Sequence, residues 1–588
     1  MLPDTNKADN ADRIILLLDL DCFYAQAMCI RLGFDSRTTP LALFQWNSVL
    51  AVTYPARERY KVKRGDSWDV VKRKSDGQCL GVHVPILEHS EGCTVDTTVT
   101  TAASLSLQEE YDAFYVLSDT DKDVARKAEL GVRKLSSQGK ASIECFRIAS
   151  ARIFQTVQAF LEEQFPGVIL ERASIDEFFL DVTAAASVVR EQNGEDTTEA
   201  IAVALAKTSD VVSTSSDNLR NSEDETMRRL QVGCWIAHGI RMAVLDSLGY
   251  TLSAGIAHNK TIAKLAASYG KPNGQAVCYP DDVPDLLDDT PISKCRFLGG
   301  KLGEAVTKLL PQGVATKVGS IAKNLSLVEL QQGMKDTASA RWVYDIAHGI
   351  DTDVVEAKEE TSLLPKSITA FKSMNFCPPG SNLMGHSLTE ASKWIQLLVK
   401  EILQRVERDT SRNHRYPTMC TLQYATERTQ SNKSMRVPFP STHWPTERRV
   451  THLIEIVTKT LDVRLKHSAK NSTLRLHRVG ICATDFVAKD ESTQSIATLF
   501  AAATATPSGN IDATASSTQP AAARIPPSPP RRPIEEPHDA CANDLAMAQK
   551  LQDNFDREQR MVEVLEQRNK QKKRKEGPRR IDSFFRKK

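Results

Sequence analysis

Two apolar runs that lie far apart in the chain, each bordered by acidic residues, constrain this fold more than any other feature. The segment Ile14–Leu18 is continuously apolar and is followed by Asp19, while SIDEFFLDVT (Ser174–Thr183) carries the adjacent acids Asp176 and Glu177 near its start. Short continuous apolar runs are typical of strands buried on both faces. Carboxylates at neighbouring strand ends repel one another unless a cation lies between them, and oxygen ligands favour Mg²⁺ or Mn²⁺. The pattern predicts a two-metal phosphoryl-transfer site, although a single acid at a strand end is most often simply solvated.

Composition excludes several other classes of protein. The 588 residues carry a net charge of only +2, so any nucleic-acid surface must come from local clustering of basic residues. The 12 cysteines include no CxxC pair, which argues against a zinc finger or a secreted disulfide scaffold and fits a reducing compartment. The polar N-terminus has no apolar signal region, and no run of 18 apolar residues occurs. We therefore expect neither secretion nor a membrane span.

A basic segment follows two predicted strands, at residues 40–45 and 49–54. In YPARERYKVKRGDS (Tyr54–Ser67), five arginine and lysine residues fall within eight positions. Basic residues beside a hairpin are most often a solvated surface. Beside a carboxylate–metal site, however, they can hold a triphosphate, because guanidinium groups bind phosphate oxygens in a bidentate way.

The stretch Tyr250–Val277 combines a short strand, a helix over Lys260–Tyr269 and the turn KPNG. Gly270 and Pro272 end the predicted helix. Lysines on an amphipathic helix are usually surface residues, but the order of strand, helix and KPNG is much more specific.

A glycine-rich turn between helices comes next, in FLGGKLGEAVTKLLPQGV (Phe297–Val314). Backbone N–H groups at a helix N-terminus can bind a DNA phosphate without reading sequence. This interpretation selects Gly299, Gly300, Lys301 and Gly303, and a turn needed only for packing fits the sequence equally well. Further on, two strand–helix alternations within residues 361–488 predict a small α/β module rich in arginine and lysine.

These motifs together resemble the Y-family (translesion) DNA polymerases. The family's first motif has the form D-hydrophobic-D-x-F-F/Y and its second S-I/L-D-E; both occur here in the family's order, at residues 19–24 and 174–177. Y-x-A-R at residues 54–57 and the lysine-rich stretch ending in KPN at residues 271–273 resemble two further motifs. The segment LGGKLG resembles the thumb sequence of the eta branch of the family.

The resemblance implies an α+β multidomain chain shaped as a right-hand polymerase. It has a ferredoxin-like palm, small fingers, a helical thumb with a helix–hairpin–helix, an α/β little finger and a disordered C-terminal tail. The expected parts are a disordered N-terminus (1–12), palm (13–39 and 127–290, with an insertion at about 184–226), fingers (40–87), an inserted surface loop (88–126), thumb (291–360), little finger (361–488) and tail (489–588).

The same resemblance assigns roles to individual residues. Asp19, Asp176 and Glu177 would be catalytic and, with the backbone carbonyl of Leu20, would hold two Mg²⁺ ions, with Mn²⁺ as an alternative. Asp21 would shape the site and Phe23 would belong to the core. The nucleotide-binding residues would be Tyr24, as the steric gate against a 2′-hydroxyl, with Tyr54, Arg57, Arg64 and Lys271. One extra residue separates Arg57 from Arg64, and Lys61 stands where the family usually has glycine.

The tail contains three short motifs after a Pro/Ser/Ala-rich linker. Residues 542–567 resemble a ubiquitin-binding helix, although a plain solvated helix is the more ordinary interpretation. Residues 570–575 read as a nuclear-import signal or DNA-tethering patch, with Lys572, Lys573, Arg574 and Lys575. Residues 580–586 resemble a box that binds the sliding clamp PCNA, through Ile581, Phe584 and Phe585, with Pro578 in place of the usual glutamine.

The predicted function is DNA-directed DNA polymerisation past template damage, eta-like and directed at ultraviolet-induced pyrimidine dimers, in the nucleus. Its substrates would be primer–template DNA and deoxynucleoside triphosphates. Three alternatives stay open: another branch of the family such as a kappa-like polymerase, a nucleotide cyclase with similar metal chemistry, and a non-catalytic DNA-damage scaffold.

Overall fold

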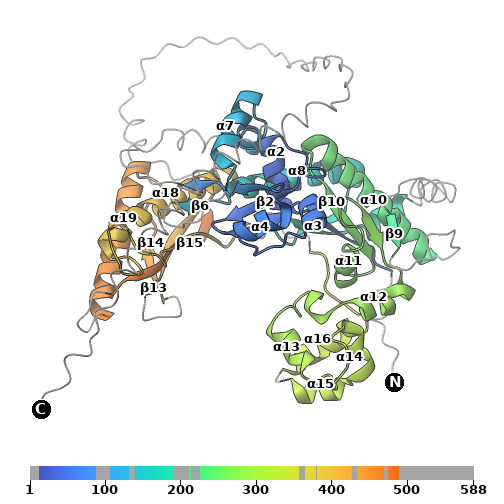
Figure 1. Ribbon diagram of the computed structural model, residues 1–588. Coiled ribbons are helices and arrows are strands. Elements are labelled where there is room, and N and C mark those ends of the chain that lie inside the picture. The colour runs from blue at the N-terminus through green and yellow to red at the C-terminus, as the bar shows by residue number, and fades with distance from the viewer. Residues whose placement is uncertain are drawn as a thin grey trace, which may run out of the picture. The chain divides into compact units, whose positions relative to one another are not determined.

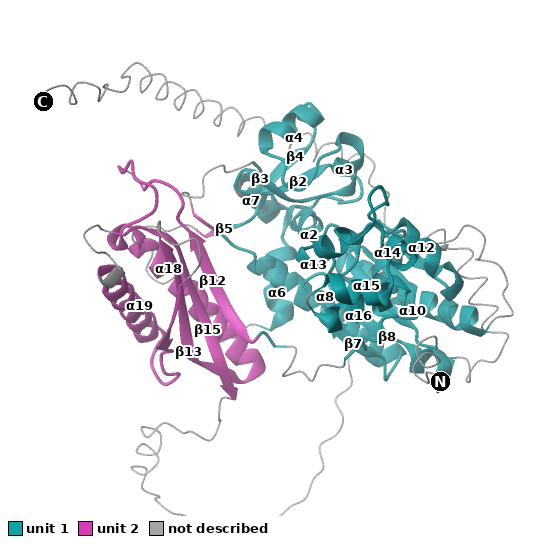
Figure 2. Cartoon of the chain, turned by 90° about the horizontal axis from the view of Figure 1, so that it is seen from below, with its two compact units in different colours: residues 1–86, 105–135, 141–365 teal, residues 87–104, 136–140, 366–588 magenta. Residues whose placement is uncertain are grey.

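A computed structural model describes residues 12–87, 106–131, 139–189, 211–213, 225–334, 336–356, 364–378, 380–426, 433–468 and 474–488. The chain forms two compact units (Figure 2), the first from residues 1–86, 105–135 and 141–365 and the second from residues 87–104, 136–140 and 366–588. The expected N-terminal segment lies almost wholly outside the described residues, and the tail from residue 489 entirely so. No helix in the described ranges is long and apolar enough to cross a membrane.

A six-stranded mixed sheet is the centre of the first unit. Its strand order is β7-β8-β1-β10-β11-β9, where β1 pairs antiparallel with both β8 and β10, and β10, β11 and β9 run parallel. The strands are β1 (Ile15–Leu20), β7 (Ile169–Arg172), β8 (Glu177–Asp181), β9 (Val211–Ser213), β10 (Leu252–Ala257) and β11 (Gln275–Val277). The structure thus confirms that both acid-bordered runs are strands.

Helices cover both faces of this sheet, which explains why β1 is continuously apolar. Ile15 and Leu17 pack with α11 (Lys260–Ala266), and Leu16 faces α10 (Glu225–Leu248) at Gly233. Helix α10 lies beside α8 (Glu144–Gln164), as Figure 1 shows. Helices α2 (Phe23–Leu32) and α6 (Leu107–Tyr115) pack beside α8, and α7 (Asp119–Glu129) packs on α2.

The close contact between β10 and α11 depends on one glycine. A Cβ atom at Gly255 would lie 1.9 Å from the carbonyl oxygen of Ala263 and 2.5 Å from the backbone nitrogen of Ala267. Glycine is therefore the residue that allows the strand and the helix to touch through their backbones.

Two expectations about insertions are wrong in part. The predicted surface loop at 88–126 contains α6 and most of α7, and α6 begins with a capping box at Ser106 and Glu109. The predicted insertion at 184–226 contributes β9 to the edge of the sheet. Sequence reasoning missed α7 because that helix is strongly polar, and β9 because it is only three residues long.

A small three-stranded sheet follows β1 and α2 in the chain. Its order is β3-β2-β4, in which β2 and β3 form the predicted hairpin and β4 runs parallel to β2. Trp68 meets Phe44 edge to face at 5.4 Å in the core of this layer. The elements are β2 (Leu41–Gln45), β3 (Ser48–Val52), α3 (Tyr54–Tyr60), α4 (Trp68–Ser75) and β4 (Leu80–His83).

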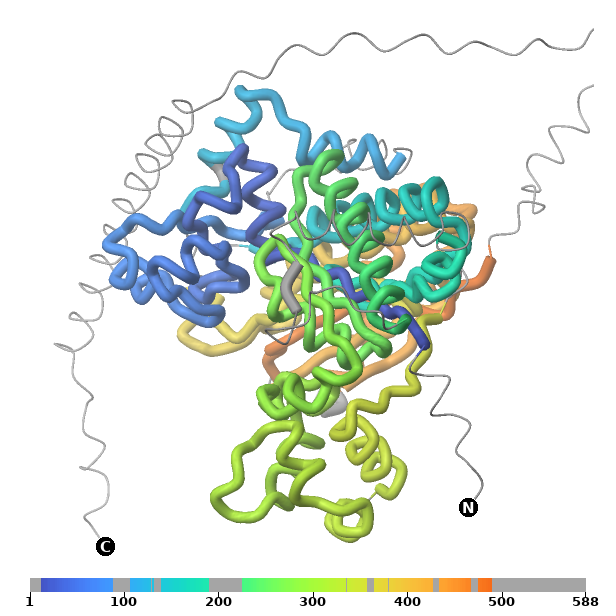
Figure 3. The backbone as a smooth tube through the Cα atoms, turned by 90° about the vertical axis from the view of Figure 1, so that its right-hand side faces the viewer, coloured from blue at the N-terminus to red at the C-terminus, as the bar shows by residue number. Residues whose placement is uncertain are grey.

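Short helices gather in a lobe of their own after β11 (Figure 3). Their buried apolar residues belong to the same core cluster as α11. They are η2 (Pro280–Asp282), α12 (Val283–Asp289), η3 (Ile292–Lys294), α13 (Lys301–Thr307), α14 (Val318–Asn324), α15 (Leu327–Gly333) and α16 (Thr337–Ala347).

The second unit contains a four-stranded antiparallel sheet with two long helices, which confirms the small α/β module predicted from the sequence. The sheet has the order β12-β15-β13-β14, and α18 and α19 share its core cluster. Its elements are β12 (Ser367–Ser373), α18 (Leu388–Asn413), β13 (Arg415–Thr426), β14 (Lys433–Pro438), α19 (Thr446–Ser468) and β15 (Leu476–Ala488). The two-residue strands β5 (Ile86–Leu87) and β6 (Lys140–Ala141) pair with each other.

Lys372 is an unusual buried lysine on β12. Its ammonium group lies 4.2 Å from the ring centroid of Trp394 and donates to the carbonyl of Gly139. Burial is the main cause that lowers the pKa of Lys372 to about 7, and the positive charges of Lys140 and Lys393 contribute to this shift. The folded protein therefore releases a proton that an unfolded chain keeps up to about pH 10.

This pKa shift predicts how the free energy of unfolding changes with pH. Between pH 7 and 10 the unfolded state binds more protons, so the free energy of unfolding should rise with pH by up to about 1.4 kcal/mol per unit. We expect Lys372→Met to remove this part of the slope. Thermal unfolding of both proteins at pH 7.5 and 9.5 measures it, and equal slopes would contradict the assignment.

Candidate active site

The predicted acids meet at the shared end of β1 and β8. Asp19 and Glu177 are direct partners in the antiparallel register, and the backbone nitrogen of Leu20 donates to the carbonyl of Asp176 at 2.9 Å. Residues about 155 positions apart in the chain are thereby held at one strand end. The structure brings together all four residues that sequence reasoning expected to surround the metal ions.

The turn before β8 is braced by side chains of its own neighbourhood. Ser174 donates from its hydroxyl to Oδ1 of Asp176 at 2.5 Å. Ser150, on α8, donates to the carbonyl of Ile175, and Arg172 donates to the carbonyl of Ser174 at 3.4 Å. These contacts fix the backbone that presents Asp176.

Each acid of the register pair has a lysine partner. Nζ of Lys271 lies 2.6 Å from Oδ1 of Asp19, and Nζ of Lys264 lies 2.8 and 2.9 Å from the two carboxylate oxygens of Glu177. Burial raises the pKa of Asp19 to about 6; Lys271 opposes that shift, and Glu177 and Asp176 add to it. The site therefore holds excess negative charge that requires a cation.

These residues suit a divalent ion. All the donors are oxygens, and two of the carboxylates come from paired strand ends. Lys264 and Lys271 balance two of the three acidic charges, so net negative charge remains for an ion. Among the described residues, no three acidic, histidine or cysteine side chains converge on one point. The carboxylates of Asp19 and Glu177 instead contact Lys271 and Lys264, respectively.

Asp21 has a different role from Asp19. It is 2% exposed and accepts hydrogen bonds from the hydroxyl of Ser253 at 2.7 Å and the backbone nitrogen of Asn273 at 2.8 Å. Gln26 donates to the carbonyl of Asp21 at 3.0 Å. Asp21 thus ties β1 to the KPN turn that carries Lys271, which agrees with the expectation that it shapes the site.

Tyr24 lies near the acids, whereas Phe23 is buried, as expected for a core residue. The Tyr24 ring meets Phe146 edge to face at 4.8 Å. Burial and the charge of Asp176 raise the pKa of the Tyr24 hydroxyl, while Arg147 and Arg64 lower it. The hydroxyl is therefore within electrostatic reach of both arginines. Sequence reasoning selected Arg64 and missed Arg147, because nothing in the helical pattern of α8 distinguishes that arginine.

Tyr54 and Arg57 occupy consecutive turns of α3. The guanidinium carbon of Arg57 lies 4.8 Å from the Tyr54 ring centroid. Burial and the charges of Asp21 and Asp19 raise the pKa of Tyr54, so this ring lies beside the acids. Lys61 ends α3 with φ of 54°, the left-handed conformation that glycine adopts most readily, which explains why the family usually has glycine at that position.

Packing explains one glycine of the glycine-rich turn, and phosphate binding by this turn stays a prediction. A Cβ at Gly303 would lie 1.9 Å from the carbonyl of Leu298, so this glycine is required for packing. Gly300 has no atom within 4 Å of such a Cβ, and Lys301 is exposed at the start of α13. Gly299 and Gly300 line a shallow pocket beside α13.

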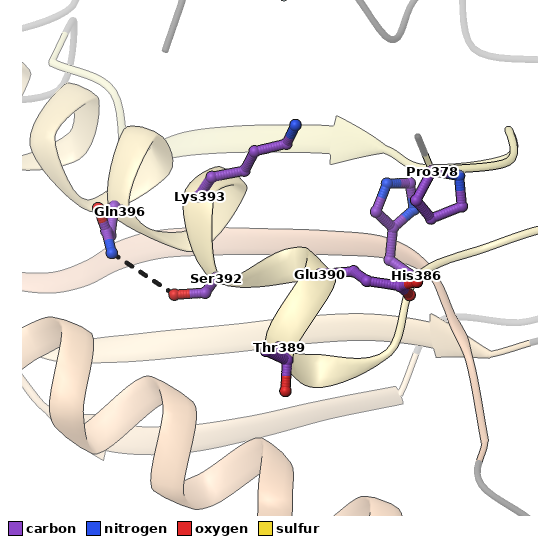
Figure 4. Close-up of a pocket in the computed structure, with 7 residues that line it drawn as sticks. All are labelled: Pro378, His386, Thr389, Glu390, Ser392, Lys393 and Gln396. Carbon is purple, nitrogen blue, oxygen red and sulfur yellow. Dashed lines mark hydrogen bonds between the residues drawn. The ribbon is translucent and has the colours of Figure 1, made fainter. Parts of the chain in front are cut away.

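A second pocket lies in the other unit, at the start of α18 (Figure 4). Its floor includes the fully buried His386, and Glu390 is held by Arg475 at 2.7 Å. Gln396 donates to the hydroxyl of Ser392 at 3.5 Å, the dashed contact in the figure. None of the residues selected from the sequence lines this pocket.

Several basic residues of the second unit are engaged in internal contacts. Arg415 pairs with Asp409 at 2.7 Å, Lys466 with Asp462 at 2.7 Å, and Arg405 donates to the carbonyl of Thr369. Their number in the sequence therefore overstates the positive charge that is free for DNA. The clamp-binding and nuclear-import residues lie outside the described residues.

Comparisons with known proteins agree with this site. The model of the impB/mucB/samB family matches residues 18–268, and a DNApol eta/Rev1 helix–hairpin–helix model matches residues 290–350. The chain belongs to this family, the Y family of DNA polymerases.

Three of the chain's relatives are named DNA polymerase eta. The chain is 28% identical to DNA polymerase eta of Drosophila melanogaster over 70% of its own length and 42% of the relative's. It is 27% identical to DNA polymerase eta of Arabidopsis thaliana over 85% of its own length and 67% of the relative's. DNA polymerase eta of Saccharomyces cerevisiae is 25% identical over 50% of this chain and 46% of the relative. The chain thus spans less than half of the fly relative and about two thirds of the plant one.

Asp19 in β1 and Asp21 just after it should respond differently to substitution. Asp21→Ala removes the acceptor of two buried hydrogen bonds, so we expect a loss of about 1–3 kcal/mol in the free energy of unfolding. Asp19→Asn relieves the repulsion among three acids and should leave stability unchanged or raised. Urea unfolding of both variants tests this, and a large destabilisation by Asp19→Asn would contradict it.

Proposed function

We propose that the chain is a DNA-directed DNA polymerase that carries out translesion synthesis past damaged template bases. The observation that carries the proposal is the meeting of Asp19, Asp176 and Glu177 at one strand end, with Lys271, Tyr54 and Arg57 beside them. Family membership and the name of the three relatives support it.

The elements suit the parts of a right-hand polymerase. The six-stranded sheet with α8 and α10 would be the palm, and the three-stranded sheet with α3 and α4 the fingers. The helices of residues 291–360 would be the thumb, and the four-stranded sheet with α18 and α19 the little finger. The helix–hairpin–helix match at residues 290–350 supports the thumb.

The reaction would be a two-metal nucleotidyl transfer. Asp19, Asp176, Glu177 and the carbonyl of Leu20 would hold two Mg²⁺ ions, which lower the pKa of the primer 3′-hydroxyl and stabilise the charge on the leaving pyrophosphate. Lys271 would leave Asp19 and bind the triphosphate, because it is a flexible cation 2.6 Å from an acid that the metal would neutralise.

Four aromatic and basic residues would position the nucleotide. Arg57 and Arg64 would bind phosphate oxygens, and Tyr54 would support Arg57 through the contact between its ring and the guanidinium group. The Tyr24 ring, held against Phe146, would lie under the sugar and exclude a 2′-hydroxyl.

DNA would be held through its backbone rather than its bases. Gly299, Gly300 and Lys301 present an open backbone and an exposed cation at the start of α13, while Gly303 lets that turn fold. These contacts with the DNA backbone would weaken as salt rises.

Pyrimidine dimers are the lesion class that the resemblance to the eta branch implies.

Primer extension tests the proposal directly. Purified protein with Mg²⁺ should extend a primer on undamaged and dimer-containing templates. Asp176→Ala should reduce extension at least about 100-fold while DNA affinity stays within about twofold, because only metal binding is lost. Asp246→Ala, an exposed acid at the end of α10, is the matched control. Loss of DNA binding together with extension would mean that Asp176 is a structural residue.

The tail would recruit partners in the nucleus. Ile581, Phe584 and Phe585 would bind PCNA, residues 570–575 would direct nuclear import, and residues 542–567 would bind ubiquitin.

Deleting residues 580–588 should leave extension on short templates unchanged and abolish its stimulation by PCNA, because the three apolar side chains of the box are removed. Extension with and without loaded clamp measures this. Replacing only Arg586–Lys588 by alanine is the control, and full stimulation of the deletion variant would refute the assignment.

A further inference from the structure

We propose that Lys264 is a positioning residue for this reaction: it fixes the orientation of Glu177 and serves as a permanent internal counter-ion beside the metal ions. This inference rests on the proposed function, since it concerns the same acids. It assigns a role to a lysine that motif spacing alone treats as an ordinary surface residue.

The contact between Lys264 and Glu177 is well defined. The ammonium group reaches both carboxylate oxygens, at 2.8 and 2.9 Å, and both side chains are largely shielded from solvent, at 31% and 20% exposed. Because one ammonium group contacts both oxygens, the direction in which the carboxylate points is set before any metal binds.

The helix that carries Lys264 is anchored on every side. Its backbone lies against β10 at Gly255, Asn259 caps its first turn, and Thr261 donates to Asp351 at 2.7 Å. Lys260, one turn before Lys264, is buried and pairs with Glu171 at 2.7 Å. Helix α11 therefore cannot withdraw the lysine by moving as a body.

Lys271 differs from Lys264 in this respect. It lies beyond α11, in the turn that Asp21 holds through Asn273, and its partner Asp19 is the other acid of the register pair. The proposed mechanism moves Lys271 to the triphosphate. Lys264 has no such second role and stays on Glu177 throughout, so it is the cation that balances the acids whenever Lys271 is away.

This arrangement predicts two effects of opposite sign. With Lys264→Met, the metal-free protein should be less stable, because Glu177 is left unpaired beside Asp19 and Asp176. The same variant should bind Mn²⁺ more tightly, by roughly three- to tenfold, because a positive charge next to the ion is gone. If Lys264 only supported the fold, the same substitution would lower both the stability of the protein and its affinity for Mn²⁺.

The experiment uses the full chain without DNA or nucleotide. Mn²⁺ binding is titrated by electron paramagnetic resonance, and the melting temperature is measured in EDTA. Lys264→Arg keeps the charge and should bind Mn²⁺ within about twofold of the parent. Lys323→Met, which breaks the remote pair with Asp288, is the matched control and should leave Mn²⁺ affinity unchanged.

Unchanged or weaker Mn²⁺ binding by Lys264→Met would overturn the proposal. If that variant does not fold, Lys264→Gln, which keeps a donor to Glu177 without the charge, must show the tighter binding instead. A steady-state split gives a further readout: kcat for primer extension should fall at least tenfold while KM for the nucleotide changes little. If the parent protein extends no primer but the Mn²⁺ pattern holds, the proposed function fails and the counter-ion role stands.

Discussion

Pairing β1 with β8 in this register forces like charges together, and much of the surrounding structure follows from that. Asp19 faces Glu177 across the strand pair, and Asp176 is one residue away. A one-residue slip would avoid the repulsion, but it would also exchange the side chains that β1 packs against α10 and α11 on its two faces. Because β1 is packed on both faces, this register is kept although it places like charges together at one strand end. Cations must therefore stabilise that end.

The chain supplies those cations from one short region. Lys264 and Lys271 come from α11 and the turn after it, and both are placed by contacts with β1 and β10. Asp21, which is expected from the sequence to shape the site rather than to hold a metal ion, is a buried acceptor that holds this turn in place. Chemically similar acids two residues apart thus act in different ways. Strand alternation would place both on one face, but β1 ends at Leu20 and Asp21 lies in the turn that follows, so its side chain is directed by that turn.

The sequence predicts the parts of the site that depend on strong local patterns. Continuous apolar runs indicated β1 and β8, and the adjacent acids indicated the ends that meet. The pairing of Lys264 with Glu177 could not be predicted, because it depends on how α11 packs on β10. The same holds for Arg147, on a helix whose apolar spacing says nothing of its polar face, and for β9, too short to produce a period. Polar helices such as α7 were taken for a loop because helix formation there depends on capping and charge rather than on an apolar stripe.

Gly255 has a consequence that reaches beyond its own strand. It has no side chain to titrate, bind or react, yet the distance between β10 and α11 is set by the absence of one carbon atom. Any larger residue would lift the helix and carry the ammonium group of Lys264 away from the carboxylate it faces. In an activity assay, variants at Gly255 would therefore behave like variants of the metal site, although all of the acidic and basic residues of that site are still present.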